Sequence, residues 1–413
     1  MIWQRRYSVL VALFCAYLLC YMDRMVIATA IPFIAEDFHL SPLAMGGVLS
    51  AFFVGYSAMQ IPGGLLADRF GPSRLMTASI VGWSCFTALT GTANSLPVLL
   101  TIRVLFGLSE GPFPPTASKA VALWFPEREV GRANGIQLAA VNVGAAIAPV
   151  LVAPLIVAWG WRSVFYSLLI PGLAVTLFVR ASVKDAPGPV RRVGHLSETD
   201  GRATGVLQAL KMPAVFWCSA TLFFANIAGW ALMNWLPTYL LQARGFAVTR
   251  MGVFASLPFL AGAFGYFLGG IISDKYFSVR RKIPIVFGLI IGGGVTYLAA
   301  VSPSGEWAVA ALTIVFFFLF ISLGGIFTLP LVLVPPAAVG GAFGLVNTVG
   351  QIAAFLSPLL VGYILNATHN NFTVIFYYVV GLVLTAACAA MQIRQPVFPT
   401  QASTSRGCLS ADD

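Results

Sequence analysis

Hydrophobic residues run along this chain in long blocks rather than in the short alternating pattern of half-buried strands. A helix needs about 20 apolar residues to cross the hydrocarbon core of a bilayer. Windows of that length predict twelve membrane-spanning helices, at 7–30, 43–67, 75–93, 96–118, 133–158, 163–181, 213–237, 250–273, 284–301, 307–330, 338–366 and 373–393. The pattern therefore predicts an all-α polytopic membrane protein.

The composition agrees with this fold class. Of the 413 residues 59% are hydrophobic and only 9% are charged, whereas a soluble domain carries about 25% charged residues. So few charges cannot cover a water-facing surface, which excludes a soluble enzyme, a nucleic-acid-binding protein and a secreted disulfide scaffold. The first span is not a signal peptide, because it lacks a small-residue cleavage site and contains Asp23 and Arg24.

Residues that bind metals or form catalytic centres are sparse. The six cysteines form no CxxC pair, and His39, His195 and His369 all lie in polar connections. We therefore expect no metal, no cofactor and no enzymatic centre. The bilayer is the expected partner, nucleic acid is not, and we expect a monomer.

The basic residues predict the orientation. Most of the 24 Lys and Arg residues lie in connections on the N-terminal side of the membrane, and Arg162, Arg244 and Arg250 are the ones expected in connections on the other side. By the positive-inside rule, both termini are cytoplasmic. This topology accounts for the net charge of +10. Short outer loops and the modest length favour a bacterial inner membrane.

The two halves of the chain repeat each other. GGLLADRFGPSR (63–74) follows the second span, and GGIISDKYFSVRRK (269–282) follows the eighth. GRANG (131–135) in the fifth span matches GGAFG (340–344) in the eleventh, and both glycine pairs are spaced for close helix approach. Repeats of this kind place a substrate site between the halves.

This repeat predicts the domain organisation, with two pseudo-symmetric six-helix bundles, a polar linker and a disordered cytoplasmic tail. The corresponding ranges are 1–181 and 213–393 for the bundles, 182–212 for the linker and 394–413 for the tail.

Four charged residues interrupt the apolar spans: Asp23, Arg24, Arg103 and Glu110. Each costs about 2.5–3.5 kcal/mol at a helix centre, so they must be paired or line a wet cavity. Arg103 and Glu110 are two turns apart on one helix face, whereas Asp23 and Arg24 diverge by about 100°. We expect Asp23 to contact Arg103, which would leave Arg24 free for a ligand. The alternative is two buried ion pairs that only fix helix register.

Three motifs resemble a known family. The loop motif G-x3-D-[RK]-x-G-x2-[RK] (64–74), echoed after the eighth span, is similar to that of the major facilitator superfamily. Tyr21-Met22-Asp23-Arg24 and the Arg103-to-Pro114 stretch containing Glu110 resemble the first and fourth spans of its anion:cation symporters, which include galactonate and hexuronate transporters. The resemblance implies proton-driven import of organic anions such as sugar acids, with Glu110 as the main proton carrier and Asp23 as the second.

A coupling mechanism follows as a hypothesis. Burial disfavours an ionised carboxyl group, and a nearby guanidinium favours it. An anionic substrate that binds Arg24 would change the field at Asp23 and Glu110, and Arg103 belongs to the same charged set. Anion and proton would then move together.

Uncharged polar residues within the spans are candidates for substrate contacts. The resemblance places Tyr21, Tyr56 and Asn347 near substrate hydroxyls. Asn142 and Gln351 are further candidates, although each could equally make an inter-helix hydrogen bond.

The repeated loop motif predicts a gate that joins the cytoplasmic ends of the halves. Its candidate residues are Asp68, Arg69, Arg74, Asp274 and Lys275. Topology alone would explain the basic residues but not the repeated acid. The second copy departs from the family pattern, because Phe277 stands where glycine is expected.

Two other transport functions compete with organic-anion symport. An organophosphate:phosphate exchanger would need convergent cations from both halves, but the second half has none in the interior of its spans, because Arg244 and Arg250 lie in an outer connection. A drug:proton antiporter would suit embedded acids, but Arg24 and Arg103 argue against a cationic cargo.

Overall fold

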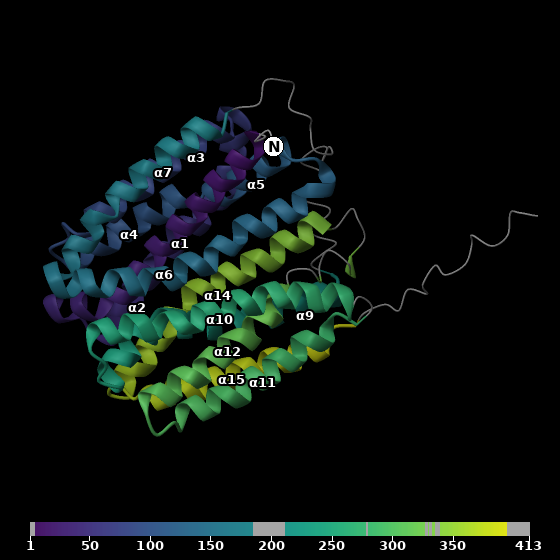
Figure 1. The fold of residues 1–413 in the computed structure, drawn as a ribbon. Helices are drawn as coiled ribbons and strands as arrows, with labels where there is room; N and C mark the ends of the chain where they lie inside the picture. Colours follow the sequence, from purple (N-terminus) through teal and green to yellow (C-terminus); the bar gives the residue numbers. More distant parts are fainter. Residues whose placement is uncertain are drawn as a thin grey trace, which may run out of the picture.

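The computed structural model describes residues 5–184, 211–277, 280–326 and 339–394, with the single residues 329, 333 and 334. Apart from residues at their borders, the predicted linker and the predicted disordered tail lie outside this part of the chain. Every described element is helical (Figure 1).

The first half contains α1 (Arg5–Phe38), α2 (Pro42–Phe70), α3 (Pro72–Thr90), α4 (Leu96–Glu110), α5 (Phe113–Trp124), α6 (Glu127–Ser167) and α7 (Leu169–Ser182). The second half contains α9 (Pro213–Thr238), the π-helix η1 (Tyr239–Ala243), α10 (Val248–Lys275), α11 (Lys282–Ala300), α12 (Gly305–Ile326), α14 (Val339–Ala367) and α15 (Phe372–Met391).

Proline and polar caps mark where several helices begin. Pro42, Pro72 and Pro213 each stand in the first turn of a helix, where the missing N–H has no intrahelical partner to lose. The Ser41 side chain also accepts a hydrogen bond from the backbone N–H of Ala44 and caps α2. These residues determine where the helices begin, and the apolar runs determine which segments span the membrane.

Ten stretches of the described residues are long and apolar enough to cross a membrane. One of them, Glu129–Ser182, has 54 residues, or about 80 Å of helix, which exceeds a single crossing. It breaks at Gly160, whose φ of 77° interrupts α6, so it supplies two spans. Together with the 19-residue α3, these stretches give the twelve predicted spans.

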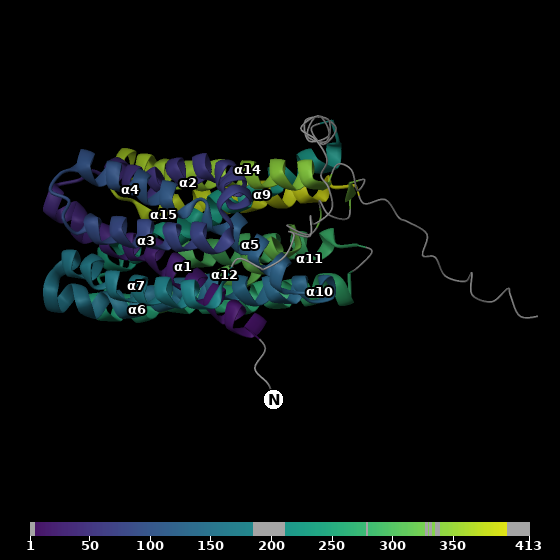
Figure 2. The ribbon, with the colours of Figure 1, turned by 90° about the horizontal axis from the view of Figure 1, so that it is seen from above.

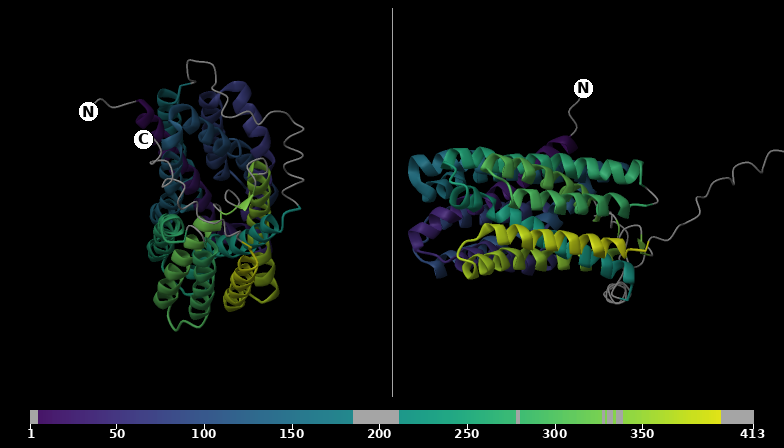
Figure 3. Two further views of the ribbon diagram at one scale, coloured as in Figure 1. Left: turned by 90° about the vertical axis from the view of Figure 1, so that its right-hand side faces the viewer. Right: turned by 90° about the horizontal axis from the view of Figure 1, so that it is seen from below.

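The helices pack as two bundles side by side. In Figure 1 the first half, drawn in purple to teal, lies above the second half, drawn in green to yellow, and the view along the bundle in Figure 3 separates the same two groups. The halves meet where α2 packs on α14, α6 on α10 and α1 on α9. Figure 2 shows α2 beside α14 from above.

We call the end of the molecule that carries Arg5, Arg69, Lys275 and Arg394 the basic end. At the opposite end the halves are in close contact. A Cβ atom on Gly46 of α2 would lie 2.4 Å from the Pro358 carbonyl oxygen of α14, and one on Gly252 of α10 would lie 2.5 Å from that of Pro149 in α6. Only glycine permits this approach of backbones.

The predicted close approach at the repeated glycine pairs is wrong where it can be examined. A Cβ atom on Gly131, Gly135 or Gly344 would meet nothing within 4 Å. These three positions lie toward the basic end. Among the described residues, the close backbone contacts that Gly46 and Gly252 make between the halves therefore have no counterpart at these three glycines.

Adjacent glycines in α2 test this packing. Gly46→Ala would push a methyl group into the α14 backbone and should lower the apparent melting temperature in detergent, because overpacking costs about 1–3 kcal/mol. Gly47 has open space around its missing Cβ, so Gly47→Ala should leave the melting temperature unchanged or raise it slightly. Equal melting temperatures for both variants would contradict the close contact.

Candidate functional site

The centre of the site is an ion pair between α1 and α4. The Arg24 Nε atom donates a hydrogen bond of 2.6 Å to Glu110 Oε1, and Arg24 Nη2 contacts the same oxygen. The side chain of Arg24 is 5% exposed and that of Glu110 is fully buried. Glu110 therefore faces the interior of the bundle rather than lipid.

Aromatic rings surround the guanidinium. Its central carbon lies 4.6 Å from the ring centroid of Tyr21, 4.7 Å from that of Phe52 and 4.4 Å from that of Tyr56. Such contacts stabilise a cation electrostatically, most strongly when water is excluded. They also restrict the rotamers of Arg24, so the charge is held in one place. Tyr21 and Tyr56, which the sequence predicted as substrate contacts, therefore both lie beside Arg24.

The ion pair differs from the expected one. Asp23 and Arg103 are both buried but form no ion pair with each other, and Asp23 Oδ1 and Arg103 Nε have no hydrogen-bond partner among the described residues. The Arg103 guanidinium instead lies 4.8 Å from the ring centroid of Phe106. Arg24 is therefore not left free, because its long side chain reaches Glu110, whereas the short Asp23 side chain does not bridge to α4.

Asp23 nevertheless belongs to the same electrostatic group. The charges of Glu110 and Arg103 both act on its carboxyl group. The four charged residues that the sequence singled out thus gather in one buried region of the first half. One pair is in direct contact, and the other two side chains interact through space.

A cavity of about 650 Å³ lies between α2 and α14, on the side of the site toward the basic end. Ser57, Gln60, Asn347 and Gln351 contribute polar groups to its wall. Asn347 Nδ2 donates a hydrogen bond of 3.3 Å to Gln60 Oε1, which joins the two halves. Asn347 and Gln351 share this wall, as their spacing predicts. The amide of Gln60 was not expected.

Asn142 occupies a separate position on α6. It is 5% exposed, and its Oδ1 atom accepts no hydrogen bond from the part of the chain that the structure describes. No described contact joins its side chain to the Arg24–Glu110 pair. Its assignment to the substrate site remains a prediction.

The predicted gate residues make contacts within their own half where their side chains are described. Asp68 accepts a 2.7 Å hydrogen bond from Lys119 Nζ, which also donates to the Ala67 carbonyl oxygen at 2.9 Å. Lys119 therefore ties α5 to the end of α2. Arg69 and Lys275 lie against the aromatic rings that follow them in the chain, Arg74 is exposed, and the side chain of Asp274 lies outside the description.

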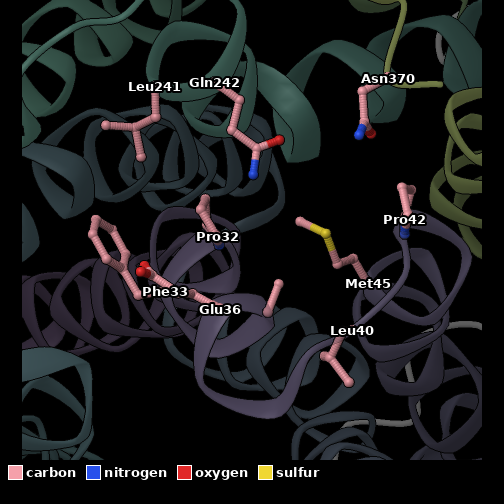
Figure 4. A pocket seen from close by; sticks show the side chains of 10 residues that line it. Pro32, Phe33, Glu36, Leu40, Pro42, Met45, Leu241, Gln242 and Asn370 are labelled. Carbon is pink, nitrogen blue, oxygen red and sulfur yellow. The ribbon is translucent and has the colours of Figure 1, made fainter.

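A second cavity, of about 410 Å³, lies between the halves at the opposite end. Figure 4 shows Glu36 and the prolines Pro32 and Pro42 on one side of it, and the amides of Gln242 and Asn370 pointing in from the other. None of its lining residues belongs to the ion pair or its aromatic surroundings, and the same is true of the cavity between α2 and α14. The cavity between α2 and α14 is the nearer in sequence, since its Phe53 and Gln60 lie on α2 beside Phe52 and one turn from Tyr56.

Sequence reasoning missed three neighbours of the site, namely Cys20, Phe52 and Gln60. Cys20 Sγ donates a hydrogen bond of 3.2 Å to Glu110 Oε1. Cys20 precedes Arg24 by four residues and Phe52 precedes Tyr56 by four, so each shares a helix face with a residue that the sequence had singled out. That spacing was the available signal.

The twelve-span bundle with a buried ion pair and a cavity between its halves defines a polytopic membrane transporter. Residues 13–358 match the model of the Major Facilitator Superfamily, and the chain belongs to this family. The recognition from the loop and span motifs is thereby confirmed. Members of the family are transporters, so the protein is a multi-pass membrane transporter and not an enzyme.

Its relatives include bacterial organic-anion transporters. The chain is 33% identical to a probable sulfoacetate transporter of Cupriavidus necator, with 88% of each chain covered. It is 30% identical to a probable galactarate/D-glucarate transporter of Escherichia coli, over 88% of this chain and 89% of that protein. It is 28% identical to a hexuronate transporter of Bacillus subtilis, with 96% of each covered.

The fold also resembles that of a solved transporter. A bacterial homologue of the human lysosomal transporter Spinster, crystallised in an inward-facing and unoccupied conformation, superposes with a TM-score of 0.77. The sequence identity is 22%, and 95% of each chain is covered. At this identity the likeness concerns the fold alone.

The buried pair makes a prediction about stability. Glu110→Ala leaves the buried Arg24 charge without its partner, which should destabilise the protein by on the order of 3–5 kcal/mol. Replacing both residues, by Arg24→Met with Glu110→Leu, should restore part of this loss. Glu306→Ala is the matched control, because Glu306 pairs with Arg250 where both side chains are about half exposed and water screens the charge.

Thermal unfolding of the purified protein in detergent measures these differences. If the Glu110→Ala and Glu306→Ala proteins had the same melting temperature, the central pair would not be buried.

Proposed function

We propose that this transporter imports a small organic anion together with protons by alternating access. The observation that carries the proposal is the contact between Arg24 and Glu110 in buried surroundings. A single guanidinium suits one carboxylate, with which it can form two parallel hydrogen bonds. The organic-anion transporters among the relatives support the same substrate class.

Coupling follows from competition for Arg24. An incoming carboxylate that binds the guanidinium displaces Glu110, whose negative charge then loses its partner in a region of low dielectric. Protonation removes that cost. After the anion leaves, Arg24 pairs with Glu110 again and the proton is released. Asp23 interacts electrostatically with Glu110 and is the second candidate for carrying a proton.

The cavity suggests the length of the substrate. Gln60 follows Tyr56 by four residues on α2, so it lies about 6 Å further toward the basic end. An anion bound to Arg24 can reach Gln60 and Asn347 with hydroxyl groups at its other end. The amide bond between Gln60 and Asn347 would then be exchanged for bonds to the substrate. A hydroxylated sugar acid fits this span better than a short acid.

The halves would move relative to each other during transport. We propose that the bundles within 1–181 and 213–393 rock about the site, with Asp68, Asp274 and their basic neighbours closing the basic end in the alternate state. By the charge distribution the basic end is cytoplasmic, with both termini on that side. A bacterial inner membrane and a monomeric carrier complete the proposal.

Glu110→Gln tests the coupling. The variant should lose uptake of a sugar acid driven by an imposed pH gradient in proteoliposomes, because the amide cannot take up or release a proton. Exchange of internal for external substrate at equal pH should persist. Glu306→Gln, at the exposed ion pair, should retain both activities. Uphill uptake by Glu110→Gln would contradict the assignment, as would loss of both activities by the control.

The substrate length makes a separate prediction. Gln60→Leu and Asn347→Leu should each reduce the preference for galactonate over acetate in competition uptake by about tenfold or more, since a lost hydrogen bond in a buried site costs about 1–3 kcal/mol. Thr348→Val is the control, because the Thr348 hydroxyl lines the same cavity but donates to the Gly344 carbonyl oxygen of its own helix. Unchanged preference in all three variants would contradict the proposed contact.

A further inference from the structure

The two oxygens of the Glu110 carboxylate have different surroundings. Oε1 receives Arg24 Nε at 2.6 Å, Arg24 Nη2 and Cys20 Sγ at 3.2 Å. Oε2 is buried and accepts no hydrogen bond from any residue described. All the donors therefore converge on one oxygen and leave the other without a partner.

Cys20 and Arg24 approach this oxygen from the same helix. They are four residues apart on α1 and so lie on one face of it, while Glu110 ends α4. A carboxylate oxygen can only accept, so the thiol S–H is the donor in this contact. Cys20 is 1% exposed, and water does not compete for its weak hydrogen bond.

We propose that Cys20 is a positioning residue for proton coupling, which holds Glu110 by Oε1 and so presents Oε2 as the oxygen that takes the proton. This inference rests on the proposed function of Glu110. When a substrate anion takes Arg24 away, the thiol remains as the donor on Oε1. The carboxyl group then keeps its orientation while Oε2 is protonated, and it is ready to pair with Arg24 again.

Other charged or titratable groups act on the same region and stay in place when the thiol is replaced. They are Tyr21, Asp23 and Arg24 of α1, Tyr56 of α2 and Arg103 of α4. A Cys20 variant leaves all of them intact, so a changed pH profile reports the loss of the one donor.

Two substitutions separate donation from packing. Cys20→Val keeps an apolar side chain of similar size but removes the donor, whereas Cys20→Ser keeps a donor and strengthens it. Cys218→Val is the matched control, since Cys218 is another buried thiol, on α9 in the second half, and has no hydrogen-bond partner among the described side chains.

The first readout is the pH dependence of gradient-driven sugar-acid uptake in proteoliposomes. Without the thiol the ionised carboxylate is less stabilised, so Cys20→Val should move the midpoint of the profile to higher pH by about half a unit or more. Exchange at equal pH should stay within about twofold of the unmodified protein. Cys20→Ser should keep the original midpoint or move it to lower pH, and Cys218→Val should leave it unchanged.

The second readout does not depend on transport. The infrared S–H stretching band of Cys20, obtained from the difference between the unmodified protein and Cys20→Val, should move when Glu110 is replaced by Gln. If Cys20→Val does not fold, the same band is obtained from the difference between the unmodified protein and Cys20→Ser, which also lacks the S–H group, and its response to Glu110→Gln tests the inference.

A Cys20→Val profile that coincides with that of the unmodified protein would overturn the inference, as would an S–H band unaffected by Glu110→Gln. Uphill uptake retained by Glu110→Gln would instead overturn the proposed function itself, so the two failures are distinguishable.

Discussion

The Arg24–Glu110 contact constrains the rest of the site, because it is the one direct ion pair among the four buried charged residues described there. Glu110 is fully buried and Arg24 nearly so, and removing one partner of such a pair leaves an uncompensated charge. In the proposed mechanism, an anion that takes the guanidinium obliges Glu110 to become neutral. Substrate binding and protonation would then be linked without a long-range signal, since both events meet at one nitrogen–oxygen contact.

The fold divides the tasks between the halves. The first half alone supplies the ion pair and the rings of Tyr21, Phe52 and Tyr56, so the charged site would move as one body with its helices in the proposed rocking. The second half approaches it with Asn347, whose bond to Gln60 crosses the interface. Close backbone contacts such as Gly46 with Pro358 hold the halves together at the end opposite to the basic loops. The proposed rocking would thus change the wall of the cavity while the ion pair keeps its geometry.

The sequence was sufficient for the spans and for the identity of the charged residues, because hydrophobic length and the cost of intramembrane charge are properties of the chain itself. It was insufficient for the pairing. Residue spacing shows that Asp23 and Arg24 point in different directions, but the rotation of α1 against α4 and the reach of the arginine decide which one meets Glu110. The glycine spacing at 131–135 likewise predicted a contact that depends on helix arrangement. Cys20, Phe52 and Gln60 carry no charge and stood out only once their neighbours were placed.

The most direct test of the account is the number of protons exchanged when a sugar acid binds to the purified protein. Calorimetric titration with galactonate near neutral pH, in buffers of different ionisation enthalpy, measures this number without a membrane or a gradient. If the anion displaces Glu110 from Arg24, binding takes up about one proton from the buffer. Binding of the anion with no proton uptake across the pH range would contradict the central claim.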